Sequence, residues 1–217
     1  MVCKSYITVT HMQAAPRGAL AYMACRFDPH GTGLVGLPQK LPEQSLILVD
    51  DLHPIGRHDP ALVTGQLQQL CKKFHPAGLV LDLQRPKTAP AAAMCKAIVA
   101  CTQLPVAVTA PYAQNLNCPV FLTAPLGKKL SQLLTPWKGR EIWLDIPLGQ
   151  LTQGTPSDQS CAAISCWQWD RFLCCGYAKT GENTYTLCRN KALLPKILEE
   201  AARLGIPKAL VLYSEWQ

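Results

Sequence analysis

The stretch GLVLDLQRPK, residues 78–87, begins as a buried strand and carries an acid, Asp82, and an amide, Gln84, among its leucines. A continuous run of Leu and Val is typical of a strand covered on both faces in a parallel sheet. Because side chains alternate along a strand, Asp82 and Gln84 share one face, and the leucines at 79, 81 and 83 share the other. We expect the leucines to pack against helices and Asp82 and Gln84 to face inward.

Seven further runs of the same kind are bounded by Pro, Gly or Asp and occupy residues 6–10, 19–25, 45–51, 106–111, 120–125, 141–148 and 209–216. Helical patterns lie between several of them, at residues 59–74, 88–101, 127–137 and 191–205. Strand and helix in alternation predict an α/β fold with a parallel sheet. Eight such strands predict a small (β/α)8 TIM-type barrel with reduced helices, a single domain over residues 1–217.

Two features complicate this fold. The connections at 11–18 and 112–119 are short for parallel crossovers, which normally need a dozen or more residues, so an open doubly wound sheet is the alternative. The segment 172–189 predicts a β-hairpin around the polar turn Thr180–Asn183, inserted before the last helix. Residues 149–160 are rich in Gly, Ser and Thr and predict a loop.

Composition narrows the function classes. No apolar run reaches the roughly 18 residues that span a bilayer, and the N-terminus MVCKSYITVTHMQ is too polar for a signal peptide, so no membrane partner is expected. The net charge of +7 is scattered, with 7% aromatic residues, which argues against a nucleic-acid partner and is compatible with an anionic glycan or cell-wall polymer. No nucleotide-binding glycine motif occurs, so no cofactor is expected.

The cysteines indicate free thiols in a reducing compartment. There are 11 of them, an odd number, with no C-x-x-C pair. The densest group, between Cys161 and Cys175, fits no zinc spacing and has no histidine near it, so no metal site is expected.

Acids close several of the predicted strands, and a barrel gathers the carboxyl ends of its strands at one mouth. These acids are Asp50, Asp51, Asp82, Asp145 and Glu215. A buried strand carries a carboxylate only with a partner or a purpose. Alternatively, Asp82 is a buried acid satisfied by hydroxyl groups or by Arg85, and Asp50 and Asp51 cap a loop. Trp216, at a strand end, is placed to stack on a sugar, and Trp167 and Trp169 before the hairpin are further candidates.

These segments resemble the family 18 glycoside hydrolases. AGLVLDLQRPK (77–87) is similar to their fourth-strand signature, D-G-x-D-x-D-x-E, and REIWLDIPLGQ (140–150) is similar to their seventh strand. The hairpin, last helix and Trp-bearing final strand follow in the order of the spore and cell-wall branch of that family. The chain departs from the signature, because Ala77 and Val80 replace the first two aspartates, Asp82 matches the third, and Gln84 replaces the glutamate. Gly149 also replaces the tyrosine of the seventh strand.

In that family the substrate's N-acetyl group attacks the anomeric carbon, the last aspartate orients it, and the glutamate donates the proton. Gln84 has no titratable proton to deliver. The resemblance therefore implies a degenerate, catalytically silent barrel that binds an N-acetylhexosamine-containing glycan, peptidoglycan or chitin-like. Its cleft would contain Asp82, Gln84 and Trp216, with Asp50, Asp51 and Glu215 also contributing to ligand binding.

Two alternatives stay open. The chain is an active glycoside hydrolase in which Asp145 or Glu215 supplies the proton and Asp82 keeps its role, or it is a protein-interaction barrel that binds through the hairpin and the Trp167/Trp169 loop. The resemblance and the missing signal together imply a cytoplasmic or spore-associated protein. The oligomeric state stays open.

Overall fold

The computed structural model describes residues 2–10, 18–152, 155–157, 167–179 and 185–212. Its main sheet has the strand order β1-β14-β8-β7-β6-β5-β4-β2-β3, and β1 also pairs with β2. Eight parallel strands therefore close into a (β/α)8 TIM-type barrel, which confirms the predicted fold and rules out the open sheet. Within the described residues, no helix is both long and apolar enough to cross a membrane.

The barrel strands are short and match the predicted runs. They are β1 (Lys4–Val9), β2 (Leu20–Phe27), β4 (Leu46–Asp50), β5 (Gly78–Asp82), β6 (Val106–Thr109), β7 (Val120–Thr123), β8 (Ile142–Asp145) and β14 (Lys208–Leu212), with β3 (Leu34–Val35) antiparallel to β2. The short crossover at 112–119 is accommodated because α3 (Ala110–Ala113) is a single turn that begins directly after β6. β6 and β7 nevertheless pair in parallel.

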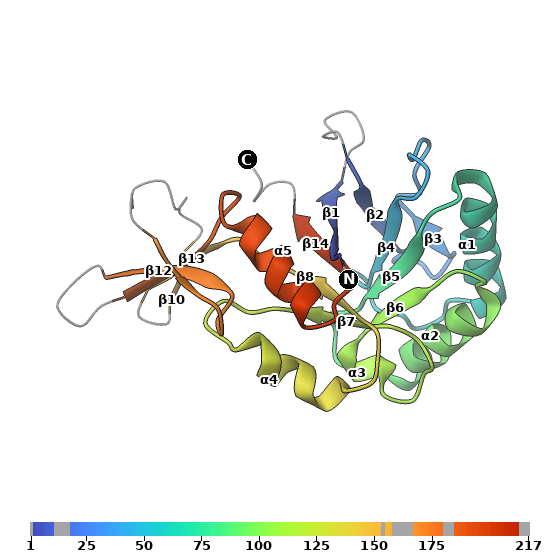
Figure 1. The fold of residues 1–217 in the computed structure, drawn as a ribbon. Coiled ribbons are helices and arrows are strands. Elements are labelled where there is room, and N and C mark those ends of the chain that lie inside the picture. The colour runs from blue at the N-terminus through green and yellow to red at the C-terminus, as the bar shows by residue number, and fades with distance from the viewer. Residues whose placement is uncertain (1, 11–17, 153–154, 158–166, 180–184, 213–217) are drawn as a thin grey trace. The chain divides into compact units, whose positions relative to one another are not determined.

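The chain divides into two compact units: an N-terminal unit of residues 6–122 and 140–143, and a C-terminal unit of residues 1–5, 123–139 and 144–217. In the N-terminal unit, α1 (Pro60–Phe74) and α2 (Ala89–Cys101) pack beside β4, β5 and β6 (Figure 1). Each helix begins at a side chain that caps it. Asp59 accepts from the Ala61 amide at 2.9 Å, and Thr88 accepts from the Ala91 amide at 3.3 Å.

One glycine is needed in this unit because two neighbours leave no room for a side chain. Gly78 begins β5 with φ 157°, and a Cβ there would lie 2.6 Å from the Trp143 ring and 2.8 Å from the Pro105 carbonyl oxygen. Trp143 is fully buried, so the ring cannot move aside easily. The glycine lets the strand that carries Asp82 lie against this indole.

The C-terminal unit holds more β structure than the predicted hairpin. β12 (Cys175–Lys179) and β13 (Tyr185–Arg189) form that hairpin, with its turn outside the described residues, and they belong to a five-stranded antiparallel sheet of order β10-β9-β13-β12-β11. β9 (Gly149–Thr152) and β10 (Thr155–Ser157) belong to this sheet, so the prediction of a loop over 149–160 is wrong there. β13 pairs with β9, and this long-range partner overrides the loop-like composition.

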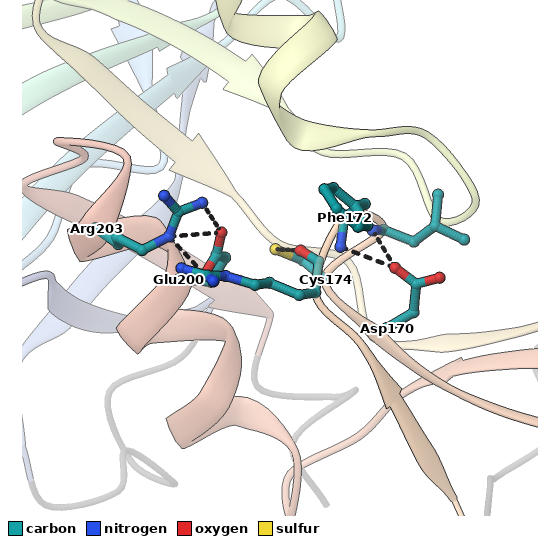
Figure 2. Close-up of polar contacts among 7 residues, drawn as sticks. Asp170, Phe172, Cys174, Glu200 and Arg203 are labelled. Atoms are coloured by element: carbon teal, nitrogen blue, oxygen red, sulfur yellow. Dashed lines mark hydrogen bonds and ion pairs between the residues drawn. The ribbon is translucent and has the colours of Figure 1, made fainter.

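The described helices of this unit are α4 (Leu130–Leu134), a 3-10 turn (Thr135–Trp137) and α5 (Leu194–Arg203). A carboxylate on α5 connects this helix to the five-stranded sheet. Glu200 accepts hydrogen bonds from Arg203 and from Arg171, which follows β11 (Gln168–Asp170) (Figure 2). Asp170 in turn accepts from the amides of Phe172 and Leu173, at 2.8 and 3.0 Å. These bonds fix the turn between β11 and β12 against α5.

The thiols agree only partly with the prediction. Eight cysteines among the described residues are free, and six of them are buried: Cys3, Cys25, Cys95, Cys118, Cys174 and Cys175. Burial raises the pKa of these six thiols, to about 12 for Cys25 and Cys95, so they act as small apolar core residues. Cys188 departs from the expectation, because it is disulfide-bonded.

Candidate functional site

Charged side chains meet in one row at the carboxyl ends of three neighbouring strands of the N-terminal unit. The parallel register pairs Arg26 of β2 with Asp50 of β4, and Asp50 with Asp82 of β5. Residues paired in this way project from the same face of a sheet. All three side chains are half-buried. The predicted gathering of Asp50 and Asp82 is therefore present, with an arginine added to it.

The opposite face at this level is apolar and belongs to the core. Cys25, Val49 and Leu81, which are in register with one another, are 0% exposed. Phe27 packs the edge of its ring against His58, just before α1, with 5.3 Å between ring centroids. Since side chains alternate, Arg26 lies on the face away from His58 and α1.

Asp82 and Gln84 are bonded to each other, as their shared face predicted. The Gln84 amide donates through Nε2 to Oδ1 of Asp82. Burial raises the pKa of Asp82, the Gln84 hydrogen bond lowers it, and the charges of Asp50 and Asp51 raise it, with a net upward shift. Gln84 itself is exposed at the strand end. The pair thus offers a carboxyl group that is reluctant to ionise and an amide with unused hydrogen-bonding capacity.

Asp51 has a different task, although it is adjacent to Asp50. It is 3% exposed, and its carboxylate accepts from the backbone amides of Gln84 at 2.8 Å and of Arg85 at 3.0 Å. Arg85 returns two bonds, from Nε to the Asp51 carbonyl at 2.8 Å and from its terminal nitrogen to the Leu52 carbonyl at 2.7 Å. Both oxygens of Asp51 are used in holding the segment that carries Gln84.

Asp50 caps the loop that follows it, as the alternative interpretation of this residue had it. Its Oδ1 accepts from the Leu52 amide at 3.0 Å. This bond uses one of its two carboxylate oxygens, and the register places Asp50 on the same face as Asp82. Asp50 therefore shapes the loop and adds negative charge beside Asp82, which is one cause of the raised pKa there.

The segment after β5 is also held from β6 and α3 by residues that the sequence did not single out. Thr109 donates to the Leu83 carbonyl at 3.2 Å, and the buried Tyr112 hydroxyl lies 3.4 Å from the Pro86 carbonyl. Lys87 donates to the Pro111 carbonyl at 2.8 Å, with its Nζ 5.9 Å from the centre of the Tyr112 ring. Thr109 shares one sequence signal with Asp82, namely a polar side chain at the end of an apolar strand.

The other predicted site residues belong to the C-terminal unit. Asp145 ends β8 and is half-buried, and its charge acts on Arg189, which is 1% exposed. Arg189 donates to the carbonyls of Cys174 at 3.0 Å, Leu173 at 3.1 Å and Ala124. Glu215 and Trp216 lie outside the described residues.

A pocket of about 540 Å³ lies at the opposite ends of β5 and β6, where α1 and α2 terminate. Its lining contains amides, thiols, a lysine and a histidine but no carboxylate: Gln44, Gln68, Cys71, Lys72, His75, Pro76, Cys101, Thr102, Gln103 and Leu104. Active sites of this barrel type sit at the carboxyl ends of the strands. The row at Arg26, Asp50 and Asp82 is therefore the better candidate. Among the described residues, no three His, Cys, Asp or Glu side chains are grouped so as to hold a metal ion.

Comparison with known proteins shows similarity at the level of fold. No family model and no curated protein sequence matches the chain. Among solved structures, a class V chitinase from Nicotiana tobaccum has a TM-score of 0.62 and 9% identity, over 100% of this chain and 95% of that one. A mutant of that chitinase in complex with NAG4 has a TM-score of 0.64 and 10% identity, with the same coverage.

The spore cortex-lytic enzyme of Bacillus cereus is also similar, with a TM-score of 0.62 and 10% identity over 97% of this chain and 70% of that enzyme. Identities this low say nothing about individual site residues. In fold, the chain is a (β/α)8 barrel similar to those of a class V chitinase and a spore cortex-lytic enzyme.

Proposed function

We propose that this chain binds an N-acetylhexosamine-containing glycan, peptidoglycan or chitin-like, at the carboxyl ends of β4 and β5, and that it hydrolyses the glycan poorly or not at all. The observation that carries the proposal is the bond from the Gln84 amide to the Asp82 carboxyl group at the end of β5. The fold supports the ligand class, since a similar chitinase was solved in complex with NAG4.

The pair suits recognition of an acetamido sugar. Asp82 accepts one bond from Gln84 and keeps acceptor sites for a ligand N–H or O–H, and the second amide hydrogen and the carbonyl oxygen of Gln84 are available to hydroxyl groups. The Asp51 anchor holds the backbone of Gln84 in place, which reduces the entropy lost on binding. Asp50 lies next to this pair in the same row.

The same pair explains the proposed silence. Departure of a sugar oxygen from the anomeric carbon requires a proton, and general acid catalysis typically contributes a factor of about 10² to 10⁴. An amide cannot supply that proton. Asp145, the described candidate for a relocated acid, lies in the C-terminal unit, where its charge acts on the buried guanidinium of Arg189.

Slow hydrolysis is the second candidate, and one observation favours it. The pKa of Asp82 is raised by burial, so this carboxyl group retains its proton to higher pH than an exposed aspartate does. Asp82 would then act as the proton donor itself. This version predicts turnover that falls as pH rises through the pKa of Asp82.

The test combines calorimetry with mass spectrometry on one panel of ligands. N-acetylglucosamine oligomers and muropeptides are titrated into the wild-type chain, Asp82→Asn, Gln84→Glu and Gln103→Glu, and the same mixtures are analysed for cleavage. Gln103→Glu makes the same chemical change at an exposed position remote from the row. We expect the wild type to bind without cleaving, Asp82→Asn to weaken binding, and Gln84→Glu alone to introduce slow cleavage.

The other outcomes are equally informative. Cleavage by the wild type, lost in Asp82→Asn, would replace the silent-cleft proposal by the slow hydrolase. The absence of both binding and cleavage across the whole panel would overturn the glycan proposal and leave a protein-interaction barrel as the better explanation.

A further inference from the structure

Arg26 stands out in the row because its guanidinium makes no hydrogen bond to the part of the chain that the structure describes. It is half-buried at the end of β2, and it makes no hydrogen bond or ion pair with any residue in the described part of the chain. A guanidinium carries five N–H donors, and removing it partly from water without a partner costs free energy. This cost is recovered when an anionic ligand accepts hydrogen bonds from the guanidinium N–H groups.

Two cations of the segment after β5 are engaged. Arg85 donates to the carbonyls of Asp51 and Leu52, and Lys87 donates to the carbonyl of Pro111. These two side chains therefore support the loop after β5. Arg26 differs from them in two ways. It lies on the face of the strands that carries Asp50 and Asp82, and its N–H donors remain available to a ligand.

The two acids of the row do not neutralise Arg26 by direct contact. Asp50 accepts from the Leu52 amide and Asp82 accepts from the Gln84 amide. Neighbouring strands lie about 4.8 Å apart, so Arg26 and Asp82 are separated by roughly 10 Å across the sheet. The row is thus polarised, with positive charge at β2 and acidic groups at β4 and β5. A ligand that spans it would place an anionic group near Arg26 and an uncharged group near Asp82.

We propose that Arg26 forms a subsite for a carboxylate. The preferred ligand is then a glycan that carries an acidic substituent beside the N-acetylhexosamine, and a neutral chitin-like chain binds less tightly. This inference rests on the glycan binding proposed above and specifies its substrate class. The guanidinium fork matches a carboxylate with two parallel hydrogen bonds, which are stronger than neutral ones and are more directional than the contact of a lysine.

The experiment compares three tetrasaccharides by calorimetry at low salt. One is the N-acetylglucosamine tetramer, the second carries lactyl carboxylates on alternate sugars, and the third is the second with its carboxylates converted to methyl amides. Each is titrated into the wild type, Arg26→Gln, Arg26→Lys and the control Arg57→Gln, which removes an exposed arginine outside the row. Thermal unfolding confirms that each variant is folded.

The wild type and Arg57→Gln are expected to bind the carboxylated chain about tenfold more tightly than either uncharged chain. Arg26→Gln should lose this preference while it keeps the affinity for the uncharged chains. Arg26→Lys should keep part of the preference, because the charge stays but the fork is lost.

Two results would count against the inference, and they are distinguishable. If the wild type binds all three chains equally, or if Arg26→Gln keeps the preference, the carboxylate subsite is wrong and the glycan-binding proposal stands. If no chain binds to the wild type, the proposed function fails and the subsite fails with it.

Discussion

Two ionisable side chains, one in each unit of the chain, are both removed from water but differ in how many hydrogen bonds the protein gives them. Arg189 is 1% exposed, and each of its three guanidinium nitrogens donates to a backbone carbonyl of its own unit. Asp82 is half-buried, accepts a single bond from Gln84, and has its pKa raised by burial. All three guanidinium nitrogens of Arg189 are engaged, whereas Asp82 keeps unused acceptor capacity.

The difference separates structural charges from those available to a ligand. A buried polar group is tolerated when all its bonds are made, and it then contributes to a single native arrangement. A group that is partly buried and only partly bonded within the protein carries a desolvation cost, and a ligand that completes its bonds recovers that cost. Arg189 and Asp51 belong to the first class, and Asp82 and Arg26 to the second. The predictions below test this division through the sign and size of each change in stability.

The largest loss is expected for Arg189→Met. The substitution keeps an apolar stem but leaves the carbonyls of Ala124, Leu173 and Cys174 without their donor. Each buried acceptor left without its donor typically costs about 1 to 3 kcal/mol, so the loss of three such bonds should cost about 3 kcal/mol or more. Chemical denaturation should therefore show a fall in unfolding free energy of that order. Arg171→Met, at a side chain that is 56% exposed, is the control and should cost no more than about 1 kcal/mol. Equal losses in the two variants would remove the distinction.

A smaller loss is expected for Asp51→Ala. The backbone amides of Gln84 and Arg85 lose their acceptor, and unsatisfied buried donors cost about 1 to 3 kcal/mol. The matched variant Asp50→Ala removes one bond to an exposed loop and should cost about 0.5 kcal/mol. Denaturation of both variants under the same conditions measures the contrast. A larger loss for Asp50→Ala would mean that the two adjacent acids have been assigned the wrong tasks.

The sequence predicted the barrel because the information needed is local. Apolar runs such as Leu46–Asp50 and Gly78–Asp82 reveal strands, and caps such as Asp59 and Thr88 reveal helix starts. The insertion sheet was seen only in part, because β9 has a loop-like composition and is defined by its long-range partner β13. Such pairing leaves no periodic signal in the segment itself.

The site was predictable to the same extent. Alternation placed Asp82 and Gln84 on one face, and the structure bonds them to each other. The sequence could not distinguish the separate roles of Asp50 and Asp51. Asp50 accepts from the nearby Leu52 amide, whereas Asp51 accepts from the Gln84 amide, 33 residues further along the chain. Arg26 was missed because its role depends on the register between β2 and β4. Register is a tertiary property.

A loss of about 1 kcal/mol is expected for Glu200→Gln, since both partner arginines are about half exposed. The hydrogen bonds from Arg203, and then from Arg171, lower the pKa of Glu200 in the folded state. Its stabilisation is therefore fully present above the ordinary carboxyl pKa and is lost as the pH falls through the lowered value. Unfolding free energies measured along this pH range should converge for the wild type and the variant in acid. Added salt should reduce the difference. A difference that grows in acid would contradict this ion-pair assignment.

The smallest change in stability, and the one with opposite sign, is expected for Asp82→Asn. Burial raises the folded-state pKa of Asp82, so the wild type is favoured below the pKa of the unfolded chain and loses stability as the pH rises through the folded value. The uncharged asparagine avoids this loss and keeps an oxygen that can accept from Gln84. The variant should therefore match or slightly exceed the wild type in unfolding free energy at pH 7, and the gain should disappear towards pH 4. Glycan affinity should fall in the same variant. If the variant is more stable but binds the glycan less tightly, Asp82 serves ligand binding at the expense of stability. A loss of stability at pH 7 would instead place Asp82 with Arg189 among the structural charges.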